Sequence, residues 1–472
     1  MLLMLFSITL LPPVVVDMLY RQDASEAFLT SYLMLLAGGF VLYLPVRRRQ
    51  ADLRIREGFV VVVLFWLVLG LAGSLPLYLY PGLAISFTDA VFESISGLTT
   101  TGATILVGLD DMPRAILFYR QELQWLGGMG IVVLAVAVMP MLGVGGMQLY
   151  RAEAPGPVKD RKLTPRIAET AKALWYIYLG LSVACALAYW VAGMDVFDAI
   201  THSFSTVAIG GFSTHDASIG YFDSVAIEIV CIVFMLLGGV NFALHFMALK
   251  QGSARTYLLD AEFRMYAKLL LFVSVAVTAF LYLTSYYTNV GEAIRHGVFH
   301  AVSIGTTTGF VIGDFATWPT FAAVLLIFAS FAGGCAGSTG GGIKAIRLLL
   351  LIKQGQRELM RLIHPNAQIS VKIGDQPVSD QVMESVWGFF AAYVALFIIL
   401  MLILMLSEQD QITAFSAVAA TMNNLGPGLG AVSANYASLP DYDKWVLCFA
   451  MLVGRLEIFT LLVLLMPAFW RK

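Results

Sequence analysis

Four long apolar stretches dominate the sequence, at 59–80, 173–194, 269–291 and 385–407. Each is long enough to cross a hydrocarbon core of about 30 Å as a helix. A helix on the surface of a water-soluble protein would carry a polar stripe, which these stretches lack. Since 59% of the 472 residues are hydrophobic and only 13% are charged, the chain is expected to be an all-α membrane protein.

Basic residues indicate on which side of the membrane the connecting loops lie. Lys and Arg gather at 47–56, 151–172, 250–268 and 344–372, and at the terminal Arg471 and Lys472. Because short basic loops stay on the cytoplasmic side, every second connection and both termini are expected to be cytoplasmic. The formal net charge of −2 indicates neither a nucleic-acid partner nor an acidic substrate.

The first apolar run and the cysteines carry no processing or redox signal. The run at 1–16 lacks a basic leading region and an Ala-x-Ala cleavage site, so it is interpreted as a retained helix. The cysteines stand in apolar surroundings without metal-type spacing, which is typical of small packing residues. They are Cys185, Cys231, Cys335 and Cys448.

After two N-terminal spans, the chain repeats one pattern four times. Each unit has a long apolar span, a shorter outside stretch and a second span that returns to a basic loop. The predicted division is 1–56 for the N-terminal spans and their basic loop, then 57–167, 168–261, 262–378 and 379–472 for the four repeats.

One glycine in each outside stretch sets the register of the repeat. These glycines are Gly102, Gly211, Gly309 and Gly426, and a small residue stands six positions before each of them: Ser96, Ser205, Ser303 and Ala420. Each preceding segment is apolar but too short to cross a bilayer. Such a half-span leaves non-helical backbone at membrane depth, which is tolerated only inside protein or beside a water-filled cavity. We therefore expect four half-helices that converge on one axis; the alternative is four ordinary surface loops.

The segments that end at these glycines contain no acidic side chain. Rings of main-chain carbonyl groups can hold a dehydrated monovalent cation, and glycine permits the backbone path that such rings need. The half-helices would also aim the partially negative ends of their dipoles at the centre of the membrane, which favours a cation. The predicted ion-binding residues are Thr100, Thr101, Gly102, Ile209, Gly210, Gly211, Thr307, Thr308, Gly309, Asn424, Leu425 and Gly426.

With these motifs, the chain resembles the Trk/Ktr/HKT superfamily of potassium transporters, and specifically its TrkH-type bacterial subunits. The resemblance covers essentially the whole chain and rests on the segments 97–104, 210–214, 306–310 and 423–428. The two extra N-terminal spans favour the Trk branch over the Ktr branch. A glycine in all four segments argues against the sodium-selective plant members, which carry serine in the first.

The resemblance implies four pseudo-symmetric helix–pore-loop–helix units around one pore, plus two N-terminal transmembrane helices. It implies potassium uptake across the bacterial cytoplasmic membrane through a gated, channel-like pore, with K+ at the filter and no organic cofactor on this chain. It also implies a homodimer and a cytoplasmic nucleotide-binding regulatory ring of the TrkA type. The alternative is a secondary transporter coupled to H+ or Na+, although such transporters usually repeat twice. An enzyme would need a clustered nucleophile and base, and the sequence contains no recognisable cluster of this kind.

A glycine-rich stretch at 332–342 interrupts the expected second span of the third unit. Each glycine costs about 1 kcal/mol relative to alanine in a helix interior, so broken backbone is expected. In the family the corresponding segment is an intramembrane loop that obstructs the pore below the filter, which assigns a gate to Gly337, Ser338, Thr339, Gly340 and Gly341. A kinked, closely packed helix is the alternative. A phosphate-binding loop is disfavoured because the Gly-Lys-Ser/Thr ending is missing.

Arg455 lies in the last predicted span, 445–470, where a charge costs at least about 2.5 kcal/mol. Glu457 would stand about 200° away around the same helix and is not expected to face Arg455. In the family, the arginine at this position projects into the pore near the loop, where it would repel a cation and help to hold the gate shut. The alternative is a structural ion pair with Glu122 or Glu228.

The remaining polar residues of the spans are interpreted as structural. His202 and His300 are expected to pack or to form hydrogen bonds, and Glu93, Asn241 and His245 to hold helices together. Four aspartates near the outer mouth would raise the local cation concentration or are simply solvated. They are Asp195, Asp198, Asp314 and Asp441.

Overall fold

The computed structural model describes residues 1–47, 55–133, 163–374 and 376–471. Parts of the predicted basic loops, 48–54 and 151–162, therefore lie outside the described residues. The described chain is mostly helical, and its strands form one antiparallel pair, β1 (Lys372–Ile373) and β2 (Gln376–Pro377). Six of its helices are long and apolar enough to cross a membrane, or eight when each of two bent pairs counts as one span.

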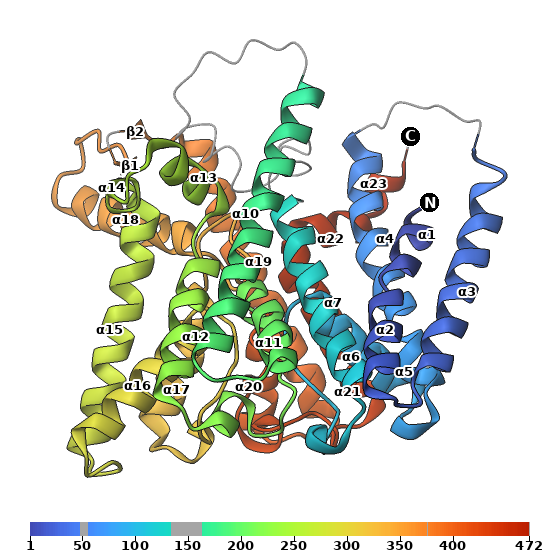
Figure 1. Cartoon of the computed structure of the whole chain (residues 1–472). Helices are drawn as coiled ribbons and strands as arrows, with labels where there is room; N and C mark the ends of the chain where they lie inside the picture. The colour runs from blue at the N-terminus through green and yellow to red at the C-terminus, as the bar shows by residue number, and fades with distance from the viewer. Residues whose placement is uncertain (48–54, 134–162, 375, 472) are drawn as a thin grey trace.

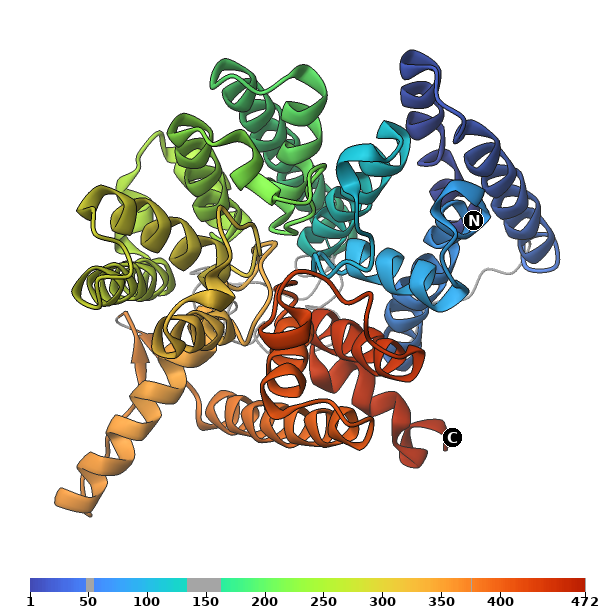
Figure 2. The same cartoon turned by 90° about the horizontal axis from the view of Figure 1, so that it is seen from below.

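The N-terminal helices form a hairpin at the edge of the molecule (Figure 2). Helices α1 (Leu2–Ile8) and α2 (Leu11–Tyr20) together make the first candidate span, and α3 (Ser25–Tyr43) returns beside them. The buried carboxylate of Asp17 accepts hydrogen bonds from the main-chain N–H groups of Ala24 and Ser25, at 3.1 and 2.9 Å. The turn between the two spans is thus tied to the end of α2.

Four times the chain then passes through a long helix, a short helix and a third helix. The first unit has α4 (Ile55–Gly73), α5 (Leu75–Leu79), α6 (Phe87–Leu98) and α7 (Arg114–Val133). The second has α10 (Leu163–Val191), α11 (Val196–Ala208), α12 (Val225–Gly238) and α13 (Phe242–Gln251). The third has α14 (Arg255–Leu259), α15 (Ala261–Leu283), α16 (Val290–Gly305), α17 (Thr320–Ala332) and α18 (Ala345–Ile363). The fourth has α19 (Asp380–Leu406), α20 (Gln411–Met422), α21 (Asp441–Leu456), α22 (Ile458–Leu465) and α23 (Pro467–Trp470).

Short 3-10 turns lie in the connections, at Pro81–Leu83, Leu109–Asp111, Ser218–Phe222, Phe315–Thr317 and Gly430–Val432. Seen from below, the four units surround a common centre, and α18 projects away from it (Figure 2).

The short helices α6, α11, α16 and α20 have 12, 13, 16 and 12 residues. At 1.5 Å per residue they reach about 18 to 24 Å, less than a hydrocarbon core. Each begins at a side-chain cap that accepts a main-chain N–H of the first turn, which fixes where the helix starts. The caps are Ser86, Asp195, Asn289 and Asp410.

The third helix of three units is broken. Helices α12 and α13 meet at 96°, and α21 and α22 meet at 116°. The prediction of one continuous last span is therefore wrong, because Glu457 takes a left-handed backbone with φ of 61° and ends α21. Between α17 and α18 the glycine-rich stretch is non-helical, as expected. Asn241, predicted to hold helices together, caps α13 by accepting the N–H of Ala243 at 2.9 Å.

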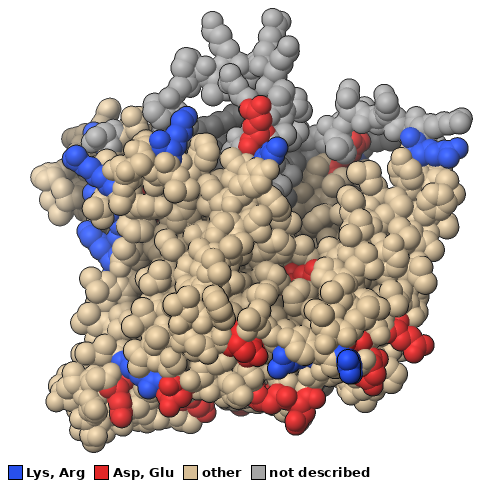
Figure 3. Space-filling view, viewed as in Figure 1, with Lys and Arg blue, Asp and Glu red and all other residues tan. Residues whose placement is uncertain are grey.

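Charge is distributed in two rims (Figure 3). On the face shown, Lys and Arg gather at the upper rim, where both termini lie (Figure 1), and most Asp and Glu lie along the lower rim. A broad band between the rims is nearly free of charge, which is the surface expected of a protein that crosses a membrane.

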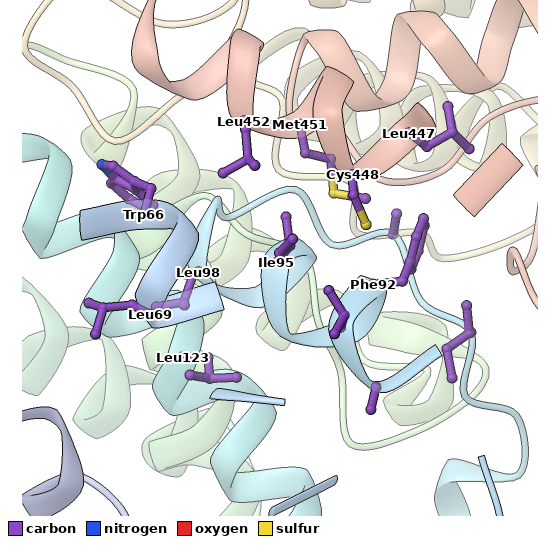
Figure 4. Close-up of a cluster of buried hydrophobic side chains, with 14 of the residues drawn as sticks. Trp66, Leu69, Phe92, Ile95, Leu98, Leu123, Leu447, Cys448, Met451 and Leu452 are labelled. Atoms are coloured by element: carbon purple, nitrogen blue, oxygen red, sulfur yellow. The ribbon is translucent and has the colours of Figure 1, made fainter. Parts of the chain in front are cut away.

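The half-helix α6 is wedged between its own unit and the fourth (Figure 4). Figure 4 shows its residues Phe92, Ile95 and Leu98 between Trp66 and Leu69 of α4, Leu123 of α7, and Met451 and Leu452 of α21. Because the first and last units pack together here, the ring of units is closed.

Helix α7 crosses the end of α6 so closely that only glycine fits at the crossing. A Cβ added to Gly127 would collide with the carbonyl oxygen of Leu98. We expect Gly127→Ala to destabilise the protein by about 1–3 kcal/mol or more, because the backbone must move. Gly130→Ala on the same helix is the control, since its Cβ would stand 3.9 Å from Trp66. Thermal unfolding in detergent measures both, and equal midpoints would contradict the prediction.

Candidate functional site

The four predicted glycines lie next to one another, at the ends of the four half-helices. All have a left-handed backbone, with φ of 79° at Gly102, 79° at Gly211, 86° at Gly309 and 96° at Gly426. A Cβ added to any of them would press against the carbonyl oxygen just before the glycine of the next segment. The pairs are Gly102 with Gly210, Gly211 with Thr308, Gly309 with Leu425, and Gly426 with Thr101. The four segments therefore meet in one closed ring rather than as separate surface loops.

The four segments also follow the same backbone path. The residue two positions before each glycine is left-handed as well, with φ of 52° at Thr100, 54° at Ile209, 70° at Thr307 and 52° at Asn424. The N–H of the residue just before each glycine donates a hydrogen bond to the carbonyl oxygen of the residue six positions before that glycine. These bonds join Thr101 to Ser96, Gly210 to Ser205, Thr308 to Ser303, and Leu425 to Ala420, at 2.7–2.9 Å. The small residues seen in the sequence stand at this turn.

Polar side chains hold the segments in place through hydrogen bonds. In the first segment the hydroxyl groups of Thr99 and Thr101 bond each other at 2.7 Å, and Asn424 of the fourth donates to Thr101 at 2.9 Å. In the third segment the hydroxyl groups of Thr306 and Thr308 are 2.8 Å apart. The fourth is also held by Tyr436, whose hydroxyl donates to the carbonyl oxygen of Gly426 at 2.7 Å.

A cavity of about 430 Å³ opens beyond the ring, and all four glycines line it. Of the four predicted mouth aspartates, Asp314 lines this cavity. Asp195 caps α11, and Asp441 accepts a hydrogen bond from Thr88 at 3.3 Å. The cavity is thus a vestibule lined by the loops of all four units.

His215 forms a clamp at this vestibule that the sequence did not reveal. Its Nδ1 lies 2.5 Å from Asp110 of the first unit, and its Nε2 lies 3.3 Å from Asp198 of α11. The ring of Tyr221 stacks on it, with centroids 3.4 Å apart. Burial lowers the pKa of His215, but the hydrogen bonds to Asp198 and Asp110 outweigh burial and raise that pKa above its usual value. The clamp joins loops of two units.

The predicted structural residues form hydrogen bonds. His202 reaches the carbonyl oxygen of Asp198 at 2.9 Å and the hydroxyl of Ser213 at 3.0 Å. His300 reaches the carbonyl oxygens of His296 and Gly313, at 2.9 and 3.1 Å.

Two further residues predicted to hold helices together do so. His245 contacts the hydroxyl of Tyr257 at 2.8 Å and the carbonyl oxygen of Leu237 at 2.9 Å. Glu93 pairs with buried Arg120 of α7 at 2.7 Å.

The glycine-rich loop lies directly against the inner ends of the segments. The hydroxyl of Thr339 donates to the carbonyl oxygen of Val207 in α11 at 2.9 Å. The N–H of Gly341 donates to the hydroxyl of Thr307 at 2.7 Å, and the N–H of Gly342 to the carbonyl oxygen of Asn423 at 3.1 Å. The loop thereby contacts the second, third and fourth units, on the side of the ring away from the vestibule.

Two basic side chains also donate hydrogen bonds to the carbonyl oxygens of this loop. Arg455, only 5% exposed, donates through Nη1 to the carbonyl oxygen of Thr339 at 2.9 Å, and Lys344 donates to the carbonyl oxygen of Gly340. Among the described residues, Nε and Nη2 of Arg455 have no hydrogen-bond partner. Lys344 stands two positions after the glycine stretch in the sequence, and this spacing is the signal by which it could have been found.

The structural ion pair considered for Arg455 is absent from the described part of the chain. Glu228 pairs instead with Arg295 at 2.6 Å, and Glu457 pairs with Arg347 at 2.5 Å. Glu122 makes no salt bridge among the described residues, and its Oε2 has no partner there. The helical argument about Glu457 does not apply, since α21 ends before that residue.

Together, the fold and this site define a class: a multi-pass helical membrane protein in which four half-helices meet at a closed ring of glycines. The chain belongs to the TrkH family, described as cation transport protein, whose family model matches residues 24–472. This membership confirms the predicted resemblance, the predicted all-α membrane fold, and the prediction of a transport protein rather than an enzyme.

Individual relatives match over nearly their whole length. The chain is 57% identical over 472 residues to the Trk system potassium uptake protein TrkH of Halomonas elongata, which covers 100% of this chain and 98% of that protein. It is 55% identical, with the same coverage, to the protein of that name from Escherichia coli strain K12. The crystal structure of the potassium transporter TrkH from Vibrio parahaemolyticus superimposes with a TM-score of 0.93 at 54% identity, covering 100% of this chain and 97% of that one.

The outer clamp predicts a pH-dependent stability. Because the folded-state pKa of His215 is raised, the protonated side chain stabilises the folded protein. This stabilisation is complete below the pKa of a free histidine and is lost as pH rises through the raised pKa. The titratable groups that face it are Asp110, Asp198, His202 and Tyr221. We expect the thermal midpoint of the wild type to fall more steeply than that of His215→Gln between about pH 5.5 and about pH 8.5. Identical slopes would contradict the clamp.

Proposed function

We propose that this chain takes up potassium ions across the cytoplasmic membrane through one pore on the axis of its four units. The observation that carries the proposal is the closed ring in which each glycine lies against the carbonyl oxygen of the next segment. The names of its relatives, Trk system potassium uptake proteins, supply the identity of the ion. K+ is the cargo, and the proposal needs no organic cofactor on this chain.

The proposed filter consists of the twelve residues that surround the ring. None has a carboxylate, so main-chain oxygens are the ligands that replace the water shell of a monovalent cation. The half-helices run from capped outer ends towards the ring, so their partially negative C-terminal ends favour a cation below the filter. The residues are Thr100, Thr101, Gly102, Ile209, Gly210, Gly211, Thr307, Thr308, Gly309, Asn424, Leu425 and Gly426.

The proposed gate is the loop that lies under this filter, together with Arg455. The loop residues Gly337, Ser338, Thr339, Gly340 and Gly341 cross the inner side of the ring, where Thr339 and Gly341 contact the ends of two units. The guanidinium group of Arg455 is hydrogen-bonded to the loop at Thr339, and its positive charge would repel a cation there. Opening then requires the loop to leave the ring.

The proposed orientation places both termini and the basic rim in the bacterial cytoplasm, and the vestibule outside. The basic segments 250–268 and 344–372 would then face the cytoplasm, where a nucleotide-binding regulatory ring of the TrkA type would contact them. A homodimer in the lipid bilayer completes the proposed assembly. Coupling to H+ or Na+ is the less favoured mechanism, since four units around one ring are typical of a pore.

Serine in place of a ring glycine tests the filter. We expect Gly102→Ser and Gly309→Ser to lower the ratio of K+ to Na+ flux at least about tenfold, because the new side chain collides with a ring oxygen and the left-handed backbone resists it. Cation flux into liposomes that contain the purified protein measures the ratio. Gly180→Ser is the control, since nothing lies within 4 Å of its Cβ position. An unaltered ratio in both ring variants would refute the filter.

Removal of the positive charge tests the gate. We expect Arg455→Gln to raise K+ flux severalfold, because the loop loses the charge that repels the ion and one of the donors that hold it. Arg455→Lys is the matched control, since it keeps the charge and should keep flux low. The same liposome assay applies, and a well-folded Gln variant with unchanged or lower flux would exclude the proposed role.

A further inference from the structure

The second segment of the ring lacks the hydroxyl groups that brace two of the others. Where the first and third segments have paired threonines three positions and one position before the glycine, the second has Ala208 and Gly210. Its backbone nevertheless follows the same path, with the same turn bond from Gly210 to Ser205 at 2.8 Å. Something outside the segment must therefore support it.

Gln124, on helix α7 of the first unit, supplies this support. Its side chain is fully buried, its Nε2 donates to the carbonyl oxygen of Gly210 at 2.6 Å, and its Oε1 accepts the N–H of Phe212 at 3.1 Å. Because a main-chain N–H requires an acceptor and a carbonyl requires a donor, only one orientation of the amide satisfies both. Gln124 thus bridges the glycine Gly211 by holding the residue on each side of it.

The same amide explains why glycine stands at position 210. Gly210 is not among the residues with positive φ, so its backbone does not demand glycine. A Cβ there would collide with the side-chain amide of Gln124. The glutamine therefore occupies the space that the side chain of a threonine, as in the first and third segments, would need.

Two neighbours on the same face of α7 extend the cradle. Gln121 Nε2 donates to the carbonyl oxygen of Phe212 at 3.1 Å, and Arg120 Nη1 donates to that of Ser213 at 3.1 Å. Arg120 is fixed in turn by Glu93 of α6 at 2.7 Å. Residues one and four positions apart lie within about 100° on a helix, so one face of the first unit holds the segment of the second.

The cradle also makes one ring oxygen chemically different. Of the four equivalent carbonyl oxygens, at Thr101, Gly210, Thr308 and Leu425, only that of Gly210 accepts a hydrogen bond from a side chain among the described residues. A carbonyl oxygen that is shared with an N–H donor offers less electron density to a cation, and the strength of the carbonyl dipoles is one determinant of selectivity.

We propose that Gln124 is a specificity-determining positioning residue of the filter. It replaces, across the boundary between two units, the hydroxyl pair that the second segment lacks, and it sets both the place and the electron density of the Gly210 carbonyl oxygen. The inference rests on the proposed function of the ring and adds to it a residue outside the ring that governs the choice between K+ and Na+.

The test compares K+ and Na+ flux in liposomes for the full-length wild type, Gln124→Ala and Gln124→Met. The methionine keeps the length of the side chain but has no N–H to donate to Gly210, so it separates loss of the donor from loss of packing. We expect the K+/Na+ flux ratio to fall roughly fivefold to thirtyfold in both variants, the range for loss of one or two buried hydrogen bonds. Trp125→Phe, next to Gln124 on α7, is the matched control: it removes the 2.9 Å hydrogen bond from Trp125 to Ser182 of α10, away from the ring, and should keep the ratio.

A double-mutant cycle separates the specific contact from general damage. Gly210→Ala should lower the ratio alone, because its Cβ collides with Gln124. In Gln124→Ala with Gly210→Ala the collision is gone, so the ratio should be no lower than in Gln124→Ala alone. If Gln124→Ala fails to fold, Gln124→Met and Gly210→Ala decide.

The outcomes distinguish failure of this inference from failure of the proposed function on which it rests. A wild type without preference for K+ over Na+ overturns the proposed function. A selective wild type with an unchanged ratio in Gln124→Met, or with additive effects in the cycle, overturns the role of Gln124 and leaves the ring intact.

Discussion

The need to satisfy main-chain polar groups at membrane depth governs this structure. Each of the four half-helices stops inside the protein, where an unpaired N–H or C=O would cost several kcal/mol. The turn bonds to Ser96, Ser205, Ser303 and Ala420 provide one partner for each segment, and the left-handed glycines let the next carbonyl oxygen approach. The carbonyl oxygens that this arrangement gathers at the ring are the ones that the proposed filter would offer to a cation.

A single polypeptide can solve this problem differently in each quarter. The first and third segments use hydroxyl pairs, the fourth uses Asn424 and Tyr436, and the second uses Gln124 of a neighbouring unit. The backbone path is nearly the same in all four, but the groups behind it are not. An assembly of four identical chains could not distribute these braces unequally, whereas here each can be altered without the others.

The sequence predicted the features that local patterns encode. The glycine register, the half-helices and the break at 332–342 depend on composition and spacing within one stretch. The contacts that sequence reasoning missed join residues far apart: Gln124 with Gly210, His215 with Asp110, and Arg347 with Glu457. The bend at Glu457 was missed for another reason, because a left-handed glutamate inside an apolar run carries no turn signal. The individual filter and gate assignments stay predictions that the flux experiments address.

The proposed filter and the proposed gate share one hydrogen-bond network, and this has a mechanical consequence. The loop under the ring donates to Thr307 and Asn423 of the segments themselves, while Arg455 and Lys344 hold its carbonyl oxygens from the other side. If the proposed gate opens by moving this loop, the hydroxyl of Thr307 loses a donor in the same step. Nε and Nη2 of Arg455 have no partner among the described residues, so the present arrangement carries a desolvation cost that would favour release of the loop. On this proposal, the bonds between loop and ring oppose opening, and any force that moves the loop acts on the third segment of the ring as well.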